Sequence, residues 1–459
     1  MHSARSPDHR VQVSRLKAFA VSAGLSILFL VVYGGCNWIT GQRGHVGSFY
    51  FQWERAIPFV PFMILPYMSI DLFFIAAPFL LRTDEELWIF SRRVVAAILI
   101  AGLSFLLFPL RFAFPYPHAS GWLGAIFNWF RGMDAPFNLL PSLHAALLLL
   151  LVDLYARKLR GVFFFAVMLW FFLIGLSPLL TYQHHVIDIV GGFVLAAYCF
   201  YFFREPSLTL PFVMNRRIGS YYATGAAVLL LLAAMFWPWG ALLLWPTIAL
   251  GIVAIGYLAV GPIVFRKTKG KVPWCTRLVL APCLLGQYFS LLYYRRRCRC
   301  WDEVTPRIWM GGKLRDSDAN KALRSGVASV LDLSAEFSEA KPFREINYRN
   351  IPVLDLTAPT QAQLAEMGEF IGDQARNNVV YVHCKIGYSR SAAAVAAFLI
   401  MSGKADTAKE AFAIIRRVRP SVVIRPEVIS ALSEFEPRLR PSPVGADSFF
   451  LASAPGVRS

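Results

Sequence analysis

Nine consecutive residues toward the C-terminal end combine a cysteine, a glycine and an arginine at a spacing suited to phosphate chemistry. They read His383-Cys384-Lys385-Ile386-Gly387-Tyr388-Ser389-Arg390-Ser391. A strand-like run, 379–382, precedes them, and a helix-like run, 391–401, follows. The backbone amides of a turn at a helix N-terminus, together with an arginine side chain, can hold the oxygens of a phosphate dianion.

The same positive surroundings favour the anionic form of Cys384. A nearby guanidinium and a helix N-terminus lower the pKa of a thiol, and the thiolate is the form that attacks phosphorus. We therefore expect Cys384 to form a cysteinyl-phosphate while Arg390 grips the phosphate. The other phosphate-binding residues are expected to be Lys385, Ile386, Gly387, Tyr388, Ser389 and Ser391. The alternative is a buried structural cysteine near a surface arginine.

This pattern resembles the dual-specificity, protein-tyrosine-phosphatase-like family over residues 301–439. The resemblance includes 307–312 (RIWMGG), 330–333 (VLDL) and 416–421 (RRVRPS). It implies an α/β cysteine-phosphatase domain at 301–440, with a central sheet flanked by helices. Lys385 is similar to the basic residue of lipid-directed members, in which extra positive charge in the loop favours highly charged headgroups.

The family resemblance also implies a general acid in a loop that precedes the cysteine. Asp355 ends a strand-like run, 348–355, that stands 29 residues before Cys384, and 356–360 reads as a loop. We therefore expect Asp355 to protonate the leaving oxygen. The alternative is an ordinary aspartate at the end of a strand.

The rest of the chain has the composition of a membrane protein. Of 459 residues, 56% are hydrophobic and only 16% are charged, and apolar stretches near spanning length recur over the first 265 residues. Because further spans follow the first, it is expected to be a retained anchor after a basic N-terminus, 1–17. The eight expected spans form a helical membrane domain, 18–265, and lie at 18–35, 57–80, 94–110, 141–156, 161–180, 186–203, 219–237 and 240–265.

The distribution of basic residues predicts the orientation of these spans. With a cytoplasmic N-terminus, the inside segments carry eighteen Lys and Arg residues, whereas the outside loops carry only Arg43, Arg55, Arg111 and Arg131. This asymmetry follows the positive-inside rule and accounts for much of the net charge of +18. We therefore expect a plasma (inner) membrane protein whose cysteine domain is cytoplasmic, and we expect no nucleic-acid partner.

A basic linker, 266–300, joins the two parts. Its apolar stretch, 278–294, is interrupted by Pro282 and Gly286 and has basic residues on both sides. We expect this stretch to lie in the interface of the bilayer or to re-enter it. A ninth span is the alternative and would place the cysteine domain outside. The tail, 441–459, is expected to be disordered.

A second set of polar residues gathers at the expected outer face of the membrane. Ser142 and His144 open the fourth span, and His184 and Asp188 stand where the sixth begins. Residues four apart share one face of a helix, so Asp188 would orient the imidazole of His184. An oriented histidine can attack phosphorus while a second histidine protonates the leaving group.

These motifs, Pro-Ser-x-His and His-x-x-x-Asp, resemble the type-2 phosphatidic acid phosphatase superfamily over residues 90–205. The likeness is greatest to its inositol-phosphotransferase and sphingolipid-synthase branch. It implies that His184 is the nucleophile, Asp188 its partner, His144 the general acid and Ser142 a phosphate contact.

The sequence departs from the superfamily pattern at Pro178, where an arginine is expected, and lacks a lysine-led first motif. Arg111 and Arg131 are then the basic residues left in that outside loop, and Arg111 is the expected phosphate contact. Fewer cations favour transfer of a phosphodiester headgroup over hydrolysis of a monoester. The alternative is a membrane domain that serves only as an anchor.

The sequence thus predicts an integral membrane phosphatase with a cysteine site inside and a histidine site outside. Its substrate is expected to be a phospholipid or a phosphoprotein. The alternatives are a protein phosphatase tethered by an inert helical domain, and a phosphate-binding scaffold, which the presence of Cys384, Arg390 and Asp355 disfavours. The seven cysteines form no disulfide or zinc pattern, so neither a metal nor a cofactor is expected. The oligomeric state is left open.

Overall fold

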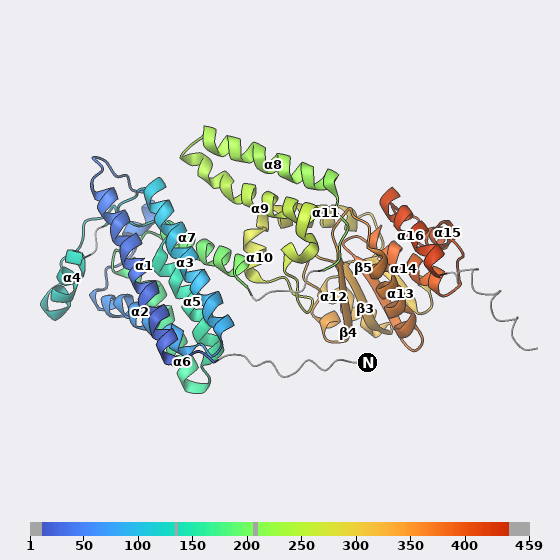
Figure 1. Cartoon of the computed structure of the whole chain (residues 1–459), viewed down its shortest axis with the longest axis horizontal. Helices are drawn as coiled ribbons and strands as arrows, with labels where there is room; N and C mark the ends of the chain where they lie inside the picture. Colours follow the sequence, from blue (N-terminus) through green and yellow to red (C-terminus); the bar gives the residue numbers. More distant parts are fainter. Residues whose placement is uncertain (1–11, 134–135, 205–209, 440–459) are drawn as a thin grey trace, which may run out of the picture. The chain divides into compact units, whose positions relative to one another are not determined.

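The computed structural model describes residues 12–133, 136–204 and 210–439 (Figure 1). The chain divides into two compact units, 1–206 and 207–459. Most of the expected basic N-terminus and all of the expected tail, 441–459, lie outside the described residues.

The first unit is built from helices. Side-chain caps fix two of their starts, because Ser14 accepts a hydrogen bond from the amide of Lys17 at 3.2 Å and Thr83 accepts one from that of Glu86 at 3.2 Å. The helices are α1 (Arg15–Gly41), η1 (Gln52–Ala56), η2 (Pro61–Met63), α2 (Ile64–Ala76), η3 (Ala77–Leu80), α3 (Asp84–Leu107), α4 (Gly121–Met133), α5 (Leu143–Lys158), α6 (Gly161–Leu180) and α7 (Val186–Phe202).

The second unit begins with a helical segment and continues into an α/β domain. The helical segment comprises α8 (Arg216–Met235), η4 (Trp239–Leu243), α9 (Leu244–Ile255), η5 (Gly256–Val260), η6 (Gly261–Phe265), α10 (Trp274–Val279) and α11 (Ala281–Arg295). The helices α8 and α9 pack against each other, and α11 packs against α9.

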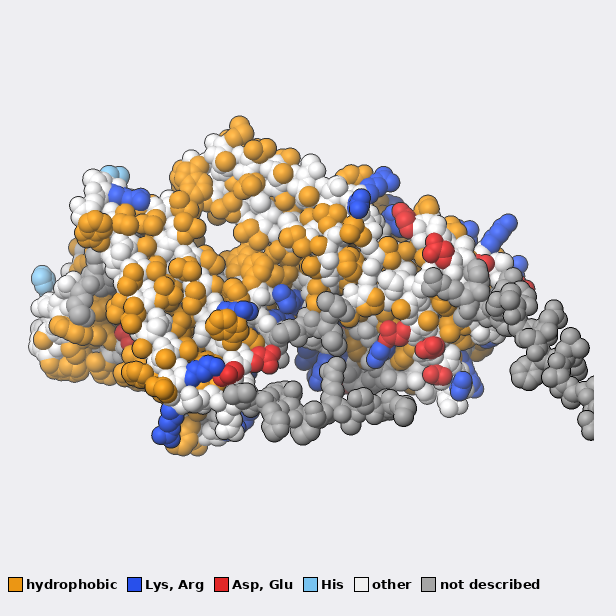
Figure 2. All heavy atoms as spheres, in the orientation of Figure 1, with side chains coloured by type: hydrophobic (Ala, Val, Ile, Leu, Met, Phe, Trp, Pro, Cys, Tyr) orange, Lys and Arg blue, Asp and Glu red, His pale blue; other side chains and the backbone are white. Residues whose placement is uncertain are grey.

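Helices cover all eight of the expected spans. Six segments are long and apolar enough to cross a membrane, by length and composition: Arg15–Gly41, Pro61–Leu80, Asp84–Leu107, Gly161–Leu180, Arg216–Met235 and Trp239–Phe265. The other two, α5 and α7, have 16 and 17 residues. Large hydrophobic side chains remain exposed on these helices, such as Val162 at 82% and Leu242 at 79%, and hydrophobic side chains cover much of the helical surface in Figure 2. Such a surface suits contact with lipid.

The helix at the third expected span begins before that span. The helix α3 begins at Asp84, whereas the apolar stretch was placed at 94–110. Thr83 caps this helix, and its first turn holds three acidic residues, which the positive end of the helix dipole stabilises. Because these first turns are charged, the apolar pattern of the sequence did not predict them.

The α/β domain has a five-stranded sheet in the order β1-β2-β5-β3-β4, in which only the pair of β1 and β2 is antiparallel. The central strand β5 is buried on both faces, as its apolar run Val379–Val382 requires. The elements are β1 (Trp301–Thr305), β2 (Ile308–Gly312), α12 (Asp316–Arg324), β3 (Val327–Ser334), η7 (Pro342–Arg344), β4 (Asn347–Val353), α13 (Gln361–Ala375), β5 (Val379–Cys384), α14 (Arg390–Met401), α15 (Ala408–Val418) and α16 (Pro426–Leu439).

Two hydrophobic cores form around this sheet. The larger core joins it to α13, α14, α15 and α16, and the smaller core joins it to α12. Small side chains let α14 pack closely, and residues 392–397 are all fully buried. The structure therefore confirms the expected α/β domain with a central sheet flanked by helices.

Candidate functional site

One turn between β5 and α14 carries both Cys384 and Arg390. Cys384 is the last residue of β5 and Arg390 is the first of α14. Gly387, within the turn, has a φ of +83°, and a Cβ atom there would lie 2.4 Å from the backbone carbonyl carbon of Gly311. Only glycine satisfies both constraints, so strand β2 fixes the shape of the turn.

The thiol of Cys384 is buried and surrounded by hydrogen-bond donors. Its Sγ accepts a hydrogen bond from the Gly387 amide at 3.3 Å and lies 3.6 Å from Ser391 Oγ. Burial raises the pKa of the Cys384 thiol, but the charge of Arg390 and the hydrogen bonds of Ser391 and Gly387 outweigh it. The pKa therefore lies below its ordinary value of 9.0, which favours the nucleophilic thiolate.

Two carboxylates hold the guanidinium of Arg390. Its Nη2 donates to Glu336 Oε1 at 2.7 Å and to Asp355 Oδ1 at 3.2 Å, while Nη1 donates to Glu336 Oε2 at 3.1 Å. Glu336 was not among the site residues predicted from the sequence. Its position just after β3 could have predicted it. The carboxyl ends of parallel strands meet at one edge of the sheet, and Cys384 lies at that edge.

Asp355 lies beside both basic residues of the turn. Its Oδ2 lies 3.4 Å from Lys385 Nζ, and the side chain is 24% exposed. Burial raises the pKa of Asp355, but the charges of Arg390 and Lys385 lower it more, so the net pKa is below its ordinary 3.8. A bound phosphate dianion would engage Arg390 and place negative charge beside Asp355. Substrate binding would therefore raise the pKa of Asp355 and prepare it to carry a proton.

The helical segment holds the backbone of the loop that carries Asp355. The hydroxyl of Tyr257, in η5, donates to the Asp355 carbonyl at 2.8 Å, and Asn215 Nδ2 donates to the Leu356 carbonyl at 2.9 Å. Leu356 has a φ of +62°, which is uncommon for a residue with a side chain. These contacts join residues far apart in the chain, and no local pattern predicted them.

A buried arginine braces the phosphate-binding turn from behind. Arg419 is 1% exposed, and its guanidinium donates to the carbonyls of Gly387 at 3.0 Å and Ile386 at 3.2 Å. It also pairs with Asp302 Oδ2 at 2.6 Å. Arg419 lies within the motif 416–421, but the sequence predicted no role for it.

Lys385 and Ser389 offer two further groups to a phosphate. Lys385 Nζ donates to Gln287 Oε1 on α11 as well as lying near Asp355. Ser389 Oγ is buried and has no hydrogen-bond partner within the described part of the chain. A phosphate oxygen would supply such a partner.

A cavity of about 570 Å³ has Cys384 in its wall. This volume is that of a small-molecule site. The α/β domain contributes Asp355, Leu356, Thr357, Cys384, Lys385, Ile386, Tyr388, Ser389, Arg390, Val423 and Arg425. The helical segment contributes Tyr222, Leu250, Pro282, Cys283, Gly286, Gln287, Ser290 and Tyr294.

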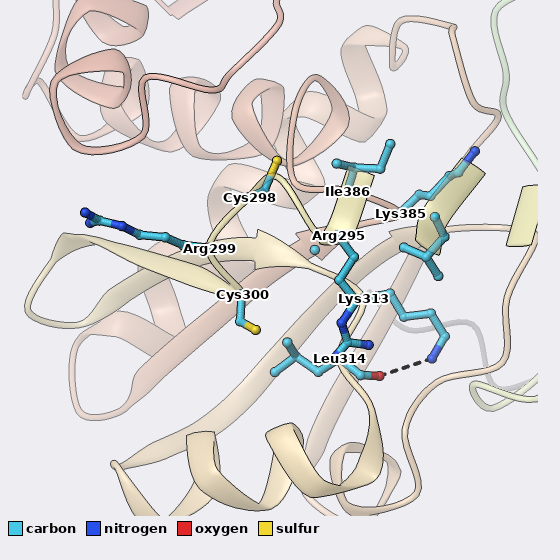
Figure 3. Close-up of a pocket in the computed structure, with 10 residues that line it drawn as sticks. Arg295, Cys298, Arg299, Cys300, Lys313, Leu314, Lys385 and Ile386 are labelled. Carbon is cyan, nitrogen blue, oxygen red and sulfur yellow. Dashed lines mark hydrogen bonds between the residues drawn. The ribbon is translucent and has the colours of Figure 1, made fainter. Parts of the chain in front are cut away.

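A smaller pocket adjoins the same turn at Lys385 and Ile386 (Figure 3). Cys298 and Cys300 line it, but their side chains point away from each other in Figure 3, so their sulfur atoms do not converge on one point. Cys298 Sγ lies 2.9 Å from the hydroxyl of Tyr388.

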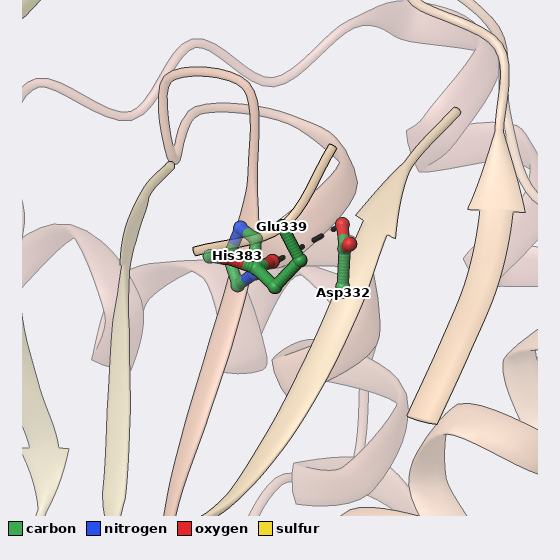
Figure 4. Close-up of side chains that lie close together, drawn as sticks. All are labelled: Asp332, Glu339 and His383. Carbon is green, nitrogen blue, oxygen red and sulfur yellow. Dashed lines mark ion pairs between the residues drawn. The ribbon is translucent and has the colours of Figure 1, made fainter. Parts of the chain in front are cut away.

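His383 belongs to a buried cluster with Asp332 and Glu339 (Figure 4). Its Nε2 lies 2.7 Å from Glu339 Oε2, and the donor atoms of the three residues lie within 4.8 Å of one another, close enough to hold a metal ion. Lys267 pairs with Asp332, and Tyr348 donates to it at 2.7 Å. Burial lowers the pKa of His383, but Glu339 and Asp332 raise it to a net value above 6.5. Protein groups thus balance the negative charge of this cluster.

The first unit brings the expected histidines near each other. His184 lies just before α7, and its Nδ1 is 3.6 Å from Asp188 Oδ2, which is longer than a hydrogen bond. His144 stacks on Tyr67 with a centroid separation of 4.6 Å and lies close enough to His184 for their charges to interact.

The other two expected residues of the histidine site have different surroundings. Ser142 Oγ accepts a hydrogen bond from the Ala145 amide at 3.2 Å and so caps α5, and Arg111 is exposed. His185 is 1% exposed, and its Nδ1 lies 2.8 Å from Glu54 Oε2, which is also buried.

A buried thiolate and an arginine on one turn, with a carboxylic acid beside them, define a cysteine-dependent phosphatase. Comparison with known proteins supports this class. The family described as "Dual specificity phosphatase, catalytic domain" matches residues 308–438. The chain belongs to the dual-specificity phosphatase family.

Two relatives and one solved structure illustrate the similarity. The phosphatidylglycerophosphate phosphatase PTPMT2 of Arabidopsis thaliana is 29% identical over 186 residues, which cover 39% of this chain and 79% of that protein. The phosphatidylglycerophosphatase and protein-tyrosine phosphatase 1 of Mus musculus is 30% identical over 171 residues, or 35% of this chain and 88% of that protein. A crystal structure of PTPMT1 matches 30% of this chain and 95% of its own chain, with 27% identity and a TM-score of 0.28.

Proposed function

We propose that this chain is a membrane-bound phosphatase that removes a phosphate monoester from a lipid headgroup. The observation that carries the proposal is the Cys384 thiol in the wall of a cavity that Lys385, Arg390 and Arg425 also line. Several cations suit a headgroup with more than one negative charge. The names of the two relatives above, which refer to phosphatidylglycerophosphate, support the same class of substrate.

The geometry supports a two-step mechanism. Cys384 Sγ attacks phosphorus, the bond from phosphorus to the alcohol oxygen breaks, and Asp355 gives that oxygen its proton. The turn amides and Arg390 hold the cysteinyl-phosphate. Water then attacks phosphorus and gives a proton to Asp355, the sulfur–phosphorus bond breaks, and inorganic phosphate leaves. Ser391 Oγ, 3.6 Å from the sulfur, would hydrogen-bond the departing thiolate.

The test uses the full chain in detergent as wild type, Cys384→Ser, His184→Ala and the double variant. Each is assayed on phosphatidate, phosphatidylglycerophosphate, phosphoinositides, phosphopeptides and p-nitrophenyl phosphate. We expect Cys384→Ser to abolish hydrolysis of at least one lipid monoester and of p-nitrophenyl phosphate. A Cys384 thiol as weakly acidic as free cysteine, together with a site that does not bind vanadate, would contradict the mechanism.

The second candidate is a protein phosphatase tethered by an inert helical domain. The mouse relative favours it, because its name includes protein-tyrosine phosphatase. Hydrolysis of phosphopeptides by wild type, with no activity on any of the lipids, would support this candidate over the first.

For the first unit we propose a type-2 phosphatidic acid phosphatase-like core at 90–205 that transfers or hydrolyses a lipid phosphoester. The 3.6 Å approach of Asp188 to His184 supports this proposal. Loss of a lipid activity in His184→Ala, but not in Cys384→Ser, would identify it. If His184→Ala matches wild type on every lipid, the first unit is an anchor.

We further propose eight spans within 18–265, an interfacial linker at 266–300 and a phosphatase domain at 301–440. The phosphatase domain would face the cytoplasm of a plasma (inner) membrane, and the histidine site would face outside. Six spanning-length segments and the excess of basic residues on one side support this topology. The hydrocarbon layer is about 30 Å thick, so a substrate shared by the two sites would have to change leaflets.

A further inference from the structure

Helix α11 has two faces of different character. Residues spaced by three or four line the cavity that contains Cys384: Cys283, Gly286, Gln287, Ser290 and Tyr294. The opposite face carries large hydrophobic side chains in the open, namely Leu285 at 54%, Tyr288 at 46%, Phe289 at 64% and Tyr293 at 51% exposed. One helix thus joins an exposed apolar surface to the catalytic cavity.

The cavity face of α11 contacts the phosphate-binding turn directly. Gln287 Oε1 accepts a hydrogen bond from Lys385 Nζ, and its Nε2 donates to the Tyr222 hydroxyl of α8 at 3.4 Å. The ring of Tyr294 lies 5.9 Å from that of Tyr388 in an edge-to-face contact. The helix is therefore a fixed wall of the cavity.

Helix α11 packs against a segment of spanning length. The segment Trp239–Phe265, which contains α9, is long and apolar enough to cross a membrane, and α11 packs against α9. Basic residues stand on both sides of α11 in the chain, and anionic lipid headgroups attract such residues. They are Lys269, Lys271 and Arg277 before it, Arg295 at its last position, and Arg296 and Arg297 after it.

We propose that α11 lies at the surface of the bilayer and admits the substrate to the catalytic cavity sideways from the lipid layer. Leu285 and Phe289 enter the edge of the hydrocarbon, the lipid body lies along Gly286 and Ser290, and the headgroup phosphate reaches Cys384. This inference rests on the proposed lipid phosphatase function. It adds that the exposed face of α11 contacts the bilayer and that its cavity face selects the lipid. The occupant of the exposed face is membrane lipid.

The role of α11 as a wall of the cavity can be tested by a substitution that makes the cavity narrower. A Cβ atom at Gly286 meets nothing within 4 Å, so Gly286→Leu adds bulk to the cavity without a clash, and replacing a glycine inside a helix favours the fold. The measured quantity is the ratio of kcat/KM for phosphatidylglycerophosphate in mixed micelles to kcat/KM for p-nitrophenyl phosphate. We expect Gly286→Leu to lower this ratio by about tenfold or more, and Gly286→Ala to lower it less.

The matched control is Gly251→Leu on α9, where an added Cβ also meets nothing within 4 Å and which does not line the cavity. We expect it to leave the ratio unchanged. An unchanged ratio in Gly286→Leu, or an equal fall in Gly251→Leu, would overturn the inference. So would an equal loss of phosphopeptide hydrolysis in Gly286→Leu, because the wall would then not select lipid.

The exposed face is tested by the double substitution Leu285→Ser and Phe289→Ser. We expect a fall in hydrolysis of the micellar lipid, whereas the soluble headgroup without acyl chains is hydrolysed as before. Equal loss on both would show that the face does not meet lipid. If wild type hydrolyses p-nitrophenyl phosphate but no lipid, the proposed function fails. If wild type hydrolyses lipid and these variants do not change selectivity, only the present inference fails.

Discussion

Arg390 is neutralised before any substrate arrives, and its two carboxylate partners differ in kind. Glu336 is 3% exposed and meets the guanidinium through both of its oxygens, whereas Asp355 is partly exposed and also contacts Lys385. Glu336 therefore keeps Arg390 in position. Asp355 can leave the guanidinium and contact the leaving oxygen of the substrate.

Removal of Glu336 should destabilise the domain. In Glu336→Ala, Arg390 keeps only Asp355 as a charged partner, and loss of one member of a buried ion pair costs about 3–5 kcal/mol of the free energy of unfolding. We expect a lower denaturation midpoint for the full chain in detergent, and a smaller change in Glu336→Gln, which keeps an oxygen acceptor. The exposed Glu369→Ala is the control. Equal midpoints for Glu336→Ala and the control would contradict this role.

The alkaline limb of the pH profile should depend on Lys385. Asp355 must hold a proton to act as an acid, so kcat falls as pH rises through the pKa of Asp355 in the complex. The charge of Lys385 lowers that pKa. Lys385→Met should raise the pKa of Asp355 and move the alkaline limb to higher pH, whereas Lys385→Arg should leave the limb near its wild-type position. The measurement is kcat against pH for an alkyl phosphate, and a limb that moves to lower pH would contradict the assignment.

The residues of the turn that the sequence predicted lie close together in the chain, whereas the site residues that it did not predict lie far from the turn in sequence. Cys384, Gly387 and Arg390 lie within one turn, so their spacing alone indicates their shared chemistry. Glu336 and Arg419 reach that turn from 54 and 32 positions away in the chain. Such contacts depend on the order of strands and on the packing of helices, which single-residue patterns do not encode.

At the scale of elements, the phosphate-binding turn is held from two sides. Strand β2 leaves no room for a side chain at Gly387, and Arg419, just after α15, holds two of the carbonyls of the turn. With its carbonyls held, the turn keeps its amides directed toward the phosphate. The catalytic geometry is therefore a property of β2, β5, α14 and α15 together.

Loss of the Arg419 brace should slow catalysis as well as weaken the fold. Arg419→Leu removes two hydrogen bonds to the turn, and a misplacement of about 1 Å can cost about 100-fold in rate. Arg419→Lys should not restore the rate, because one ammonium group cannot replace the guanidinium fork. The measurements are kcat and hydrogen exchange of residues 385–389, with the exposed Arg417→Leu as control. A lower stability without faster exchange in the turn would show that Arg419 only supports the core.

Helix positions were easier to predict than helix limits. Apolar length placed a helix at each expected span, because burial in lipid or protein demands such stretches. The first turns of α3 are polar and were missed, and α4 was not expected at all. Similarly, β1 follows a run of basic residues, and its antiparallel hairpin with β2 was not expected.

At the scale of the whole molecule, the second unit does not begin at its sheet. The compact unit starts at 207, and Lys267, in the linker, is buried against Asp332 of β3. The helical segment thus contributes a buried ion pair, a wall of the cavity and the hydrogen bonds that hold the acid loop. The phosphatase domain and two apolar segments of spanning length form one structural unit here.

The proposed topology can be tested by cysteine labelling. Cys300 is exposed on the second unit, whereas Cys384 is buried. We expect a membrane-impermeant maleimide to modify Cys300 only after the cytoplasmic face is opened, and a Cys300→Ser variant to lose that signal. Labelling of Cys300 in intact cells would place the phosphatase outside and make the apolar stretch 278–294 a ninth span.

The hydrogen bond from Tyr257 to the carbonyl of Asp355 links the proposed proton donor to the segment Trp239–Phe265. A spanning helix responds to a change in bilayer thickness by tilting. Here the tilt would move the peptide group that follows Asp355. Departure of the alcohol, and not attack by sulfur, would then be the step that senses the membrane. Esters of acidic phenols would react alike in thin and thick bilayers, whereas esters of simple alcohols would not.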